Sequence, residues 1–188
     1  MLLVPLIAVL LAGMAIDMIV SSQDRGSFFY RENRISRGRP FGLIKFRTLR
    51  VAALAEMRAA GGHARLYEAD ASNLTWAGRR LLKPWYFDEV PQLLNVLRGE
   101  ISLVGPRPWP PEMVGRQVAE GQDYRNRIPA GLTGLAQVTK GEAIPFEKLD
   151  LRYLECYDTL SSWALVGYDL QILWRTVVVI ARGEGLNY

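Results

Sequence analysis

The chain has 188 residues, of which 49% are hydrophobic, and it carries a formal net charge of +4. Its length corresponds to one domain, and its single cysteine, Cys156, excludes an internal disulfide and a cysteine-rich zinc site. The basic balance favours anionic partners, namely lipid headgroups, nucleotide phosphates or nucleic acid.

Residues 1–20 form an almost wholly apolar run, for which three interpretations compete. A cleaved signal peptide has a basic start, whereas the first basic residue of this chain is Arg25. A membrane-spanning helix needs ~20 apolar residues, a length that this run barely reaches, and Pro5 and Asp17 interrupt it. The third interpretation is a helix inserted into one leaflet, either re-entrant or interfacial. We predict a membrane-inserted segment over residues 1–20 and one further domain over residues 21–188.

A basic segment follows over residues 31–50, where seven lysines and arginines accompany a single acid, Glu32. Short strands are predicted over residues 28–30 and 41–47, with a turn at 37–42 between them. Aromatic residues interleaved with arginines suit an anionic lipid surface, a nucleic acid or a solvated face of a hairpin. No helix-turn-helix, zinc-finger or RNP pattern accompanies the charge.

Residues 51–70 are predicted to form a helix that is interrupted at Gly61-Gly62. Two adjacent carboxylates, Asp88 and Glu89, follow further along the chain. Adjacent carboxylates repel, so the pair is costly unless a metal ion or another cation lies beside it. An ionised carboxylate next to a metal ion is a nucleophile suited to phosphorus. The alternative is structural, with Asp88 as the N-cap of a helix and Glu89 as a first-turn acid.

The acidic pair is predicted to open an amphipathic helix, whose dipole favours the ionised carboxylates. Pro91 fits the first turn of this helix, and Gly99 is its predicted end. Its predicted buried face consists of Leu93, Leu94, Val96 and Leu97.

Pro106 and Pro108 restrict the backbone around Arg107. The planar guanidinium, held in an extended segment, suits bidentate contact with a phosphate or stacking on a base. The alternative is a structural ion pair with Glu100 or Glu112.

Residues 131–134 form a predicted glycine-rich turn that permits close approach of the backbone to a phosphate. Residues 146–181 are predicted to form two helices, the second of which is mostly apolar. A buried core helix is the usual source of such a pattern. The alternative is a helix in the membrane surface, with which Trp163 and Trp174 are compatible.

Motifs in five segments, spread in order over nearly the whole chain, resemble those of the bacterial sugar transferases. These proteins are the monotopic phosphoglycosyl transferases that begin membrane glycan assembly. The segments are residues 28–35 (FFYRENRI), 45–49 (KFRTL), 88–108 (DEVPQLLNVLRGEISLVGPRP), 131–138 (GLTGLAQV) and 168–173 (YDLQIL).

The resemblance implies an α+β, mostly helical fold in a single monotopic, membrane-associated domain. An N-terminal membrane-inserted helix, interfacial amphipathic helices and a small β-hairpin are expected, with the active site on the cytoplasmic face of the bacterial inner membrane. Relatives insert a helical hairpin that breaks at a Ser-Pro pair, whereas here Pro5 follows Val4 and the family's first half-helix does not precede it. Three explanations stay open: a truncated sequence, a shortened start, or a different contact with the membrane. For a hairpin with one arm, a shallow, interfacial insertion is favoured.

The resemblance also implies a reaction, the transfer of a sugar 1-phosphate from a UDP-sugar to polyprenyl (undecaprenyl) phosphate with release of UMP. This is the first membrane step of glycan biosynthesis. The catalytic domain would be residues 21–188, with Asp88 as the nucleophile that forms a phosphosugar-aspartyl intermediate. Mg²⁺, held by Asp88 and Glu89, would assist the departure of UMP, and Glu89 acts either as a metal ligand or as a base.

The substrate contacts implied by the family motifs are Lys45, Arg47, Arg107 and Gln137. Two basic positions of the family are altered in this chain, and Arg127, together with Lys140, is the candidate replacement, so Arg127 is added to the expected substrate contacts. The expected partners are the UDP-sugar, the polyprenyl phosphate and membrane lipid, with no nucleic acid, while the oligomeric state stays open, a homodimer included. The competing hypothesis is a non-catalytic peripheral membrane protein that binds anionic lipid or nucleic acid through residues 31–50.

Overall fold

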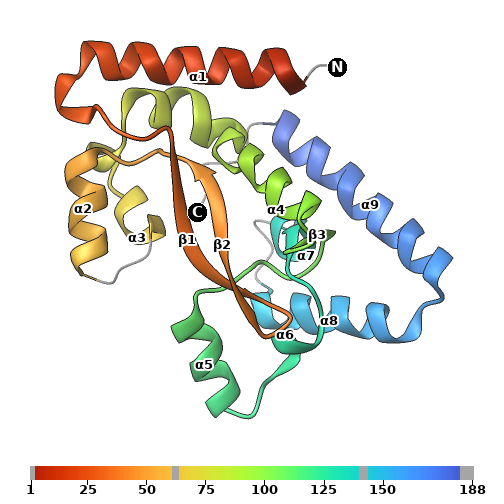
Figure 1. Ribbon diagram of the computed structural model, residues 1–188. Coiled ribbons are helices and arrows are strands. Elements are labelled where there is room, and N and C mark those ends of the chain that lie inside the picture. The colour runs from red at the N-terminus through yellow and green to blue at the C-terminus, as the bar shows by residue number, and fades with distance from the viewer. Residues whose placement is uncertain (1–2, 61–63, 140–143, 183–188) are drawn as a thin grey trace. The chain divides into compact units, whose positions relative to one another are not determined.

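The computed structural model describes residues 3–60, 64–139 and 144–182, and Figure 1 shows the course of the chain through its helices and strands. Contacts within the chain define two compact units. Of the described residues, unit 1 contains 3–30, 45–60 and 64–91, and unit 2 contains 31–44, 92–139 and 144–182. Residues 3–20 thus belong to unit 1, and the predicted boundary at residue 20 stays a prediction.

The β-hairpin is formed by β1 (Phe29–Ser36) and β2 (Arg39–Phe46). The two-residue turn between them consists of Arg37 and Gly38, whose φ angles are 49° and 70°. Two successive positive φ values are typical of a type I′ turn, which matches the twist of the strands that it joins. The first strand continues to Ser36, beyond the predicted residues 28–30, and the second begins at Arg39 instead of Phe41. Both strands reach this two-residue turn, which is shorter than the turn predicted over residues 37–42.

Helix α1 (Leu3–Val20) is continuous, with Pro5 in its first turn. Leu10 and Met14 are buried on one side of it, in a cluster that also contains Phe46 and Leu82 of unit 1. The opposite side leaves large apolar residues exposed, namely Val9, Ile16, Ile19 and Val20. The N-terminal run is therefore a helix with one face packed on protein and one apolar face open.

Two short helices, α2 (Val51–Ala59) and α3 (Ala64–Glu68), confirm the helical pattern predicted for residues 51–70. The predicted interruption at Gly61-Gly62 lies outside the described residues. These helices cover a second core of unit 1, which contains Tyr30, Leu49, Leu54, Met57, Ala64 and Leu74.

Residues 71–97 form a series of short helical elements, one of which contains the acidic pair. The elements are η2 (Ala71–Asn73), the π-helical η3 (Gly78–Leu82), η4 (Lys83–Trp85), η5 (Phe87–Gln92), which contains Asp88 and Glu89, and the α-helix α4 (Leu93–Leu97). The prediction that one amphipathic helix begins at Asp88 is wrong. Residues 87–92 form a 3₁₀ helix, and the α-helix begins only at Leu93.

The predicted buried face of this helix is only partly correct, because Leu93 and Val96 are half-buried but Leu94 and Leu97 are 47% and 82% exposed. The fully buried residue is Asn95, whose Oδ1 accepts a hydrogen bond from the main-chain nitrogen of Ile44 at 3.0 Å. Its Nδ2 donates to the carbonyl oxygen of Gly42 and to the Glu100 carboxylate. Pairing of these polar groups, rather than apolar burial, decides which face turns inward.

Unit 2 contains a small parallel sheet of β3 (Ser102–Val104) and β4 (Gly131–Thr133), with Ser102 opposite Gly131. A Cβ atom on Gly131 would lie 2.1 Å from the main-chain nitrogen of Gly105. The close backbone approach predicted for the turn at residues 131–134 is thus made by the chain to itself.

Five helices complete unit 2: α5 (Pro111–Ala119), α6 (Tyr124–Arg127), α7 (Leu135–Val138), α8 (Phe146–Thr159) and α9 (Ser162–Ala181). Helices α8 and α9 confirm the two helices predicted at the C-terminal end. Their buried residues include Leu149, Tyr153, Leu154 and Ile172, which pack in one core with Val104, Tyr124, Ile128, Leu135, Ala136 and Val138.

Helix α9 is long and apolar enough to cross a membrane, yet only 6% of its most apolar 18-residue stretch is buried. Trp163 and Trp174 are 86% and 68% exposed, and Ile172 is the residue of this helix that is fully buried. The buried core helix proposed from the sequence is therefore wrong, because α9 touches the core along one narrow side.

Candidate active site

Asp88 and Glu89 lie at the start of η5 in unit 1, and the Asp88 side chain is 2% exposed. Two residues before Asp88, Tyr86 has a φ of 55°, a left-handed conformation that is rare for a bulky residue. The carbonyl oxygen of Tyr86 accepts a hydrogen bond from the main-chain nitrogen of Glu89 at 3.0 Å. Backbone strain of this kind clusters at functional sites, where it holds side chains in fixed positions.

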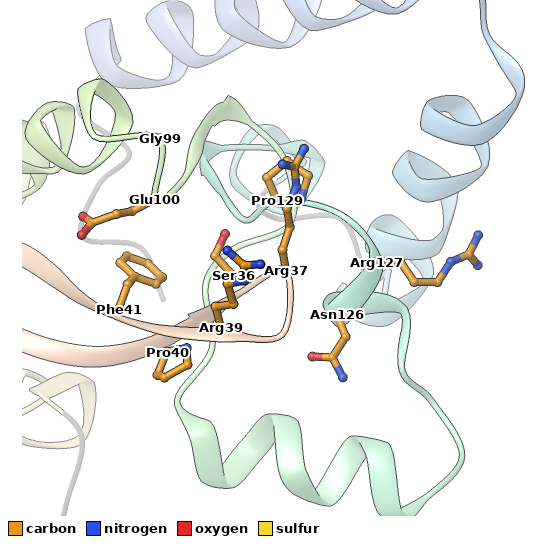
Figure 2. A pocket seen from close by; sticks show the side chains of 10 residues that line it. All are labelled: Ser36, Arg37, Arg39, Pro40, Phe41, Gly99, Glu100, Asn126, Arg127 and Pro129. Carbon is orange, nitrogen blue, oxygen red and sulfur yellow. The ribbon is translucent and has the colours of Figure 1, made fainter.

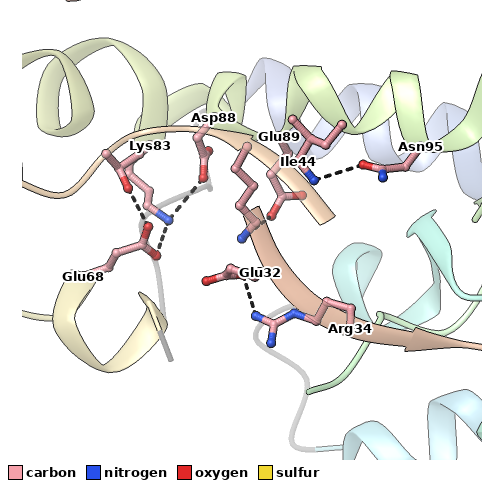
Figure 3. Close-up of polar contacts among 10 residues, drawn as sticks. Glu32, Arg34, Ile44, Glu68, Lys83, Asp88, Glu89 and Asn95 are labelled. Carbon is pink, nitrogen blue, oxygen red and sulfur yellow. Dashed lines mark hydrogen bonds and ion pairs between the residues drawn. The ribbon is translucent and has the colours of Figure 1, made fainter. Parts of the chain in front are cut away.

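Two buried ammonium groups accompany the acidic pair. The Nζ atom of Lys83 lies 3.3 Å from Oδ2 of Asp88 and 2.5 Å from Oε2 of Glu68, as Figure 3 shows. The Nζ atom of Lys45 lies 3.9 Å from Oε1 of Glu89. Three carboxylates and two ammonium groups thus share a nearly dry environment, in which charge interactions are stronger than in water.

Burial raises the pKa of Asp88 to about 6, although the positive charges of Lys83 and Lys45 act in the opposite direction. The nearby Glu89 and Glu68 carboxylates raise this pKa further. Asp88 is therefore mainly a carboxylate at neutral pH, and a desolvated carboxylate of this kind is in general a more reactive nucleophile than one in water.

The acidic pair fits a magnesium ion only if a substrate supplies further ligands. The described residues contain no group of three or more His, Cys, Asp or Glu side chains that could hold a metal ion. Mg²⁺ takes oxygen ligands, keeps several waters and binds through one or two carboxylates plus substrate phosphates. Asp88 and Glu89 provide carboxylates of this type, whereas a metal site made wholly of protein groups is not formed.

Arg47 ties together the backbone of unit 1. Its guanidinium donates hydrogen bonds to the carbonyl oxygens of Ser27 at 2.9 Å, Leu49 at 2.9 Å and Asp24 at 2.6 Å. These contacts explain why Arg47 is 3% exposed. They give the arginine a structural role, and its predicted contact with substrate stays a prediction.

The backbone of Arg107 is held by a buried arginine in unit 2. Nη1 of Arg125 donates to the carbonyl oxygen of Arg107 at 2.7 Å, and its guanidinium lies 3.8 Å from the ring centre of Trp109. Nη2 of the same group is paired with the buried Asp150 carboxylate. The Pro-Arg-Pro segment is therefore fixed from its main-chain side.

Arg127 lies at the surface of unit 2, where Nη2 is 2.8 Å from Oδ2 of Asp158. It lines a cavity of about 530 Å³, together with Arg37 of the hairpin turn and Arg39 at the start of β2. In Figure 2 the Arg127 side chain points away from the hairpin turn. The predicted contact of Arg127 with substrate stays a prediction.

Gln137 lies in α7 and its side-chain amide is buried. Neither Nε2 nor Oε1 has a hydrogen-bond partner among the residues that the structure describes. A buried amide without partners is costly. The substrate contact predicted for Gln137 stays a prediction.

The structure brings three of the predicted site residues together in unit 1, namely Lys45, Asp88 and Glu89. Arg107, Arg127 and Gln137 belong to unit 2. Sequence reasoning did not identify Lys83 and Glu68, the two residues that pair with each other beside Asp88. Lys83 precedes Asp88 by five residues, which is a weak signal, and nothing in the local pattern of residues 64–70 singles out Glu68.

A model of the bacterial sugar transferase family matches residues 1–183. The uncharacterized sugar transferase EpsL of Bacillus subtilis (strain 168) is 36% identical over 163 residues, which are 85% of this chain and 72% of that protein. The UDP-glucose:undecaprenyl-phosphate glucose-1-phosphate transferase of Caulobacter vibrioides is 36% identical over 173 residues, 89% of this chain and 60% of that protein. The protein of the same name from Escherichia coli (strain K12) is 30% identical over 169 residues, 86% and 34%. The chain therefore spans less than two thirds of the latter two relatives.

Proposed function

Because the chain belongs to the bacterial sugar transferase family, we propose that it is a phosphoglycosyl transferase. It moves a sugar 1-phosphate from a UDP-sugar to undecaprenyl phosphate and releases UMP, as the first membrane step of a glycan pathway. The observation that carries this proposal is the buried Asp88 carboxylate, 3.3 Å from the Lys83 ammonium group. The names of relatives that act on UDP-glucose and undecaprenyl phosphate support the substrate classes.

In the first half of the proposed reaction, a carboxylate oxygen of Asp88 attacks the β-phosphorus of the UDP-sugar. A new bond forms between this oxygen and the phosphorus, while the bond between the β-phosphorus and the bridging oxygen breaks. UMP leaves with the electron pair of that bond, and a phosphosugar-aspartyl intermediate remains. Lys83 and Lys45 reduce the repulsion between the anionic nucleophile and the anionic diphosphate.

In the second half, a phosphate oxygen of undecaprenyl phosphate attacks the phosphorus of the intermediate. The bond to the Asp88 oxygen breaks, so the carboxylate is regenerated and the lipid diphosphate sugar leaves. Glu89 and Asp88 are the residues that would hold a magnesium ion, which would neutralise charge on the substrate diphosphate. Glu89, 3.9 Å from Lys45, is positioned in this proposal by that lysine.

We further propose that the protein rests on the cytoplasmic face of the bacterial inner membrane through its open apolar helix faces. On α9, large apolar residues recur at helical spacing, and all are exposed: Trp163, Val166, Leu170, Trp174 and Val177. On α1, the exposed face carries Ile16 and Ile19. Tryptophans on a helix of this kind favour the interface between lipid and water.

The test is UMP release by the purified protein in detergent or lipid nanodiscs, measured across a panel of UDP-sugars. Release that requires a UDP-sugar, undecaprenyl phosphate and Mg²⁺ supports the transferase. Salt-sensitive binding of anionic lipid or nucleic acid without any turnover supports instead the non-catalytic peripheral membrane protein.

A further inference from the structure

Glu68, the last residue of α3, contacts both Thr48 of the motif at residues 45–49 and Lys83 near the acidic pair. Its Oε1 atom accepts a hydrogen bond from the Thr48 hydroxyl at 2.7 Å, and its Oε2 atom lies 2.5 Å from Nζ of Lys83. The Glu68 side chain is 6% exposed, and Thr48 is fully buried. The hydroxyl therefore orients the carboxylate so that its second oxygen faces the lysine.

Lys83 lies nearer to Glu68 than to Asp88. Its Nζ atom is 2.5 Å from Oε2 of Glu68 and 3.3 Å from Oδ2 of Asp88. Charge-assisted hydrogen bonds between ammonium and carboxylate groups are typically no longer than 2.9 Å, so the Glu68 oxygen is close enough for such a bond and the Asp88 oxygen is not. Glu68 therefore holds the ammonium group at a position from which its charge still reaches Asp88.

This unequal sharing matters for a carboxylate that has to attack phosphorus. A lysine side chain has a flexible four-carbon stem, so its ammonium group moves easily to a better acceptor. Without a second carboxylate, Lys83 would close onto Asp88 and place its donors on an oxygen that must form the new bond. A carboxylate that is fully paired and hydrogen-bonded is a weaker nucleophile.

We propose that Glu68 is a positioning residue, which holds Lys83 back from Asp88 and so keeps an oxygen of the Asp88 carboxylate free to attack. Glu68 touches neither substrate nor reacting atoms and acts through Lys83. This inference rests on the proposed function, because it assigns Glu68 a part in the formation of the phosphosugar-aspartyl intermediate.

The experiment measures the single-turnover rate of the phosphosugar adduct on Asp88, without acceptor, at pH 8 where Asp88 is ionised. Glu68→Gln keeps the shape of the side chain but removes its charge, and we expect the rate to fall about 10- to 100-fold. The KM for the UDP-sugar should change less than about twofold, since uniform substrate binding is not affected. Glu56→Gln, the same change at an exposed position of α2, is the matched control and should react like the wild type.

A second pair of variants tests the orientation of Glu68 without removing its charge. Thr48→Val deletes the hydroxyl that binds Oε1 of Glu68 and should slow the adduct in the same direction. Thr48→Ser retains a hydroxyl and should restore the rate. This pair carries the test if Glu68→Gln does not fold, as judged by its circular dichroism and melting temperature.

A double-mutant cycle separates positioning from mere structural support. If Glu68 acts through Lys83, Glu68→Gln should cause no further loss of rate in a Lys83→Gln background. Equal rates for the Glu68→Gln and Glu56→Gln variants, or losses that multiply in the double variant, would overturn the inference. A wild-type protein that forms neither UMP nor adduct would instead overturn the proposed function, and the inference with it.

Discussion

The Nζ atom of Lys83 lies 3.3 Å from Oδ2 of Asp88 in the buried interior of unit 1. Between these residues the chain passes through a 3₁₀ turn and the left-handed Tyr86. A regular helix would separate residues five apart by more than one turn and point their side chains in different directions. The strained turn brings the ammonium group to the carboxylate, whose reactivity and pKa are the subject of the first two predictions.

The first prediction concerns the nucleophile. Asp88→Asn should abolish both turnover and covalent labelling by a UDP-sugar, because an amide preserves the shape but cannot form the acyl phosphate. The measurement is mass spectrometry of acid-quenched protein without acceptor, searching for a phosphosugar adduct on the Asp88 peptide. Glu89→Gln should turn over slowly but retain a trace of adduct. An adduct on another residue, or ready turnover by Asp88→Asn, would favour direct attack by undecaprenyl phosphate in a ternary complex.

The second prediction concerns pH. Because burial raises the pKa of Asp88 to about 6, the nucleophilic carboxylate is present above this pH and is lost as the pH falls through it. At pH 5 the rate of adduct formation should be about tenfold below its plateau, since roughly one carboxylate in ten is then ionised.

A lysine variant checks the assignment of this pH dependence. Lys83 lowers the pKa of Asp88, so Lys83→Gln should move the midpoint of the rate profile to higher pH. The Glu56→Gln control should leave the midpoint unchanged. A midpoint that is the same in all three proteins would assign the titration to another group.

The third prediction concerns Arg107, whose backbone is already fixed by Arg125. Arg107→Lys should lose much of the activity while the melting temperature barely changes, because lysine keeps the charge but not the planar fork. Steady-state kinetics and a thermal melt of the same sample measure both. Full activity would mean that charge alone suffices, and a large drop in melting temperature would identify a structural arginine.

The fourth prediction compares a buried ion pair with an exposed one. Asp150→Ala leaves Arg125 buried without its carboxylate partner, which should cost about 3–5 kcal/mol of the free energy of unfolding. Asp158→Ala removes the partner of the half-exposed Arg127 and should cost less than about 1 kcal/mol. Urea titration of the two variants measures the loss in free energy of unfolding for each. Similar losses would show that the buried pair of Arg125 and Asp150 does not stabilise unit 2 more than the exposed pair does.

The fifth prediction concerns the membrane. The double variant Trp163→Ala, Trp174→Ala should bind liposomes less strongly while its melting temperature stays the same, because both side chains are exposed. Co-sedimentation at low and high salt measures this binding, with Val118→Ala on α5 as the control. Deletion of residues 1–20 should also weaken binding. This deletion removes Leu10 and Met14 and exposes the core residues that they cover, Phe46 and Leu82, so the melting temperature of the deletion variant has to be measured as well.

Local patterns in the sequence were sufficient for several features of this protein. The helical periodicity predicted α2, α3, α8 and α9, because amphipathic spacing depends on neighbours within one or two turns. The acidic pair was recognisable as a candidate nucleophile, and the order of motifs predicted the family that the comparison confirmed. These features depend on adjacent residues or on residues three to four apart.

The tertiary structure decided the environment of those residues. Glu68 and Lys83 are fifteen residues apart, and Ile44 and Asn95 are fifty-one apart, so no helical or strand spacing connects them. The burial of Asn95 in place of Leu94 follows from polar groups that only the folded chain brings within hydrogen-bond distance. Sequence singles out the candidate nucleophile, whereas long-range packing determines which ammonium group lies beside it, because charge pairing in a dry interior depends on distance in space.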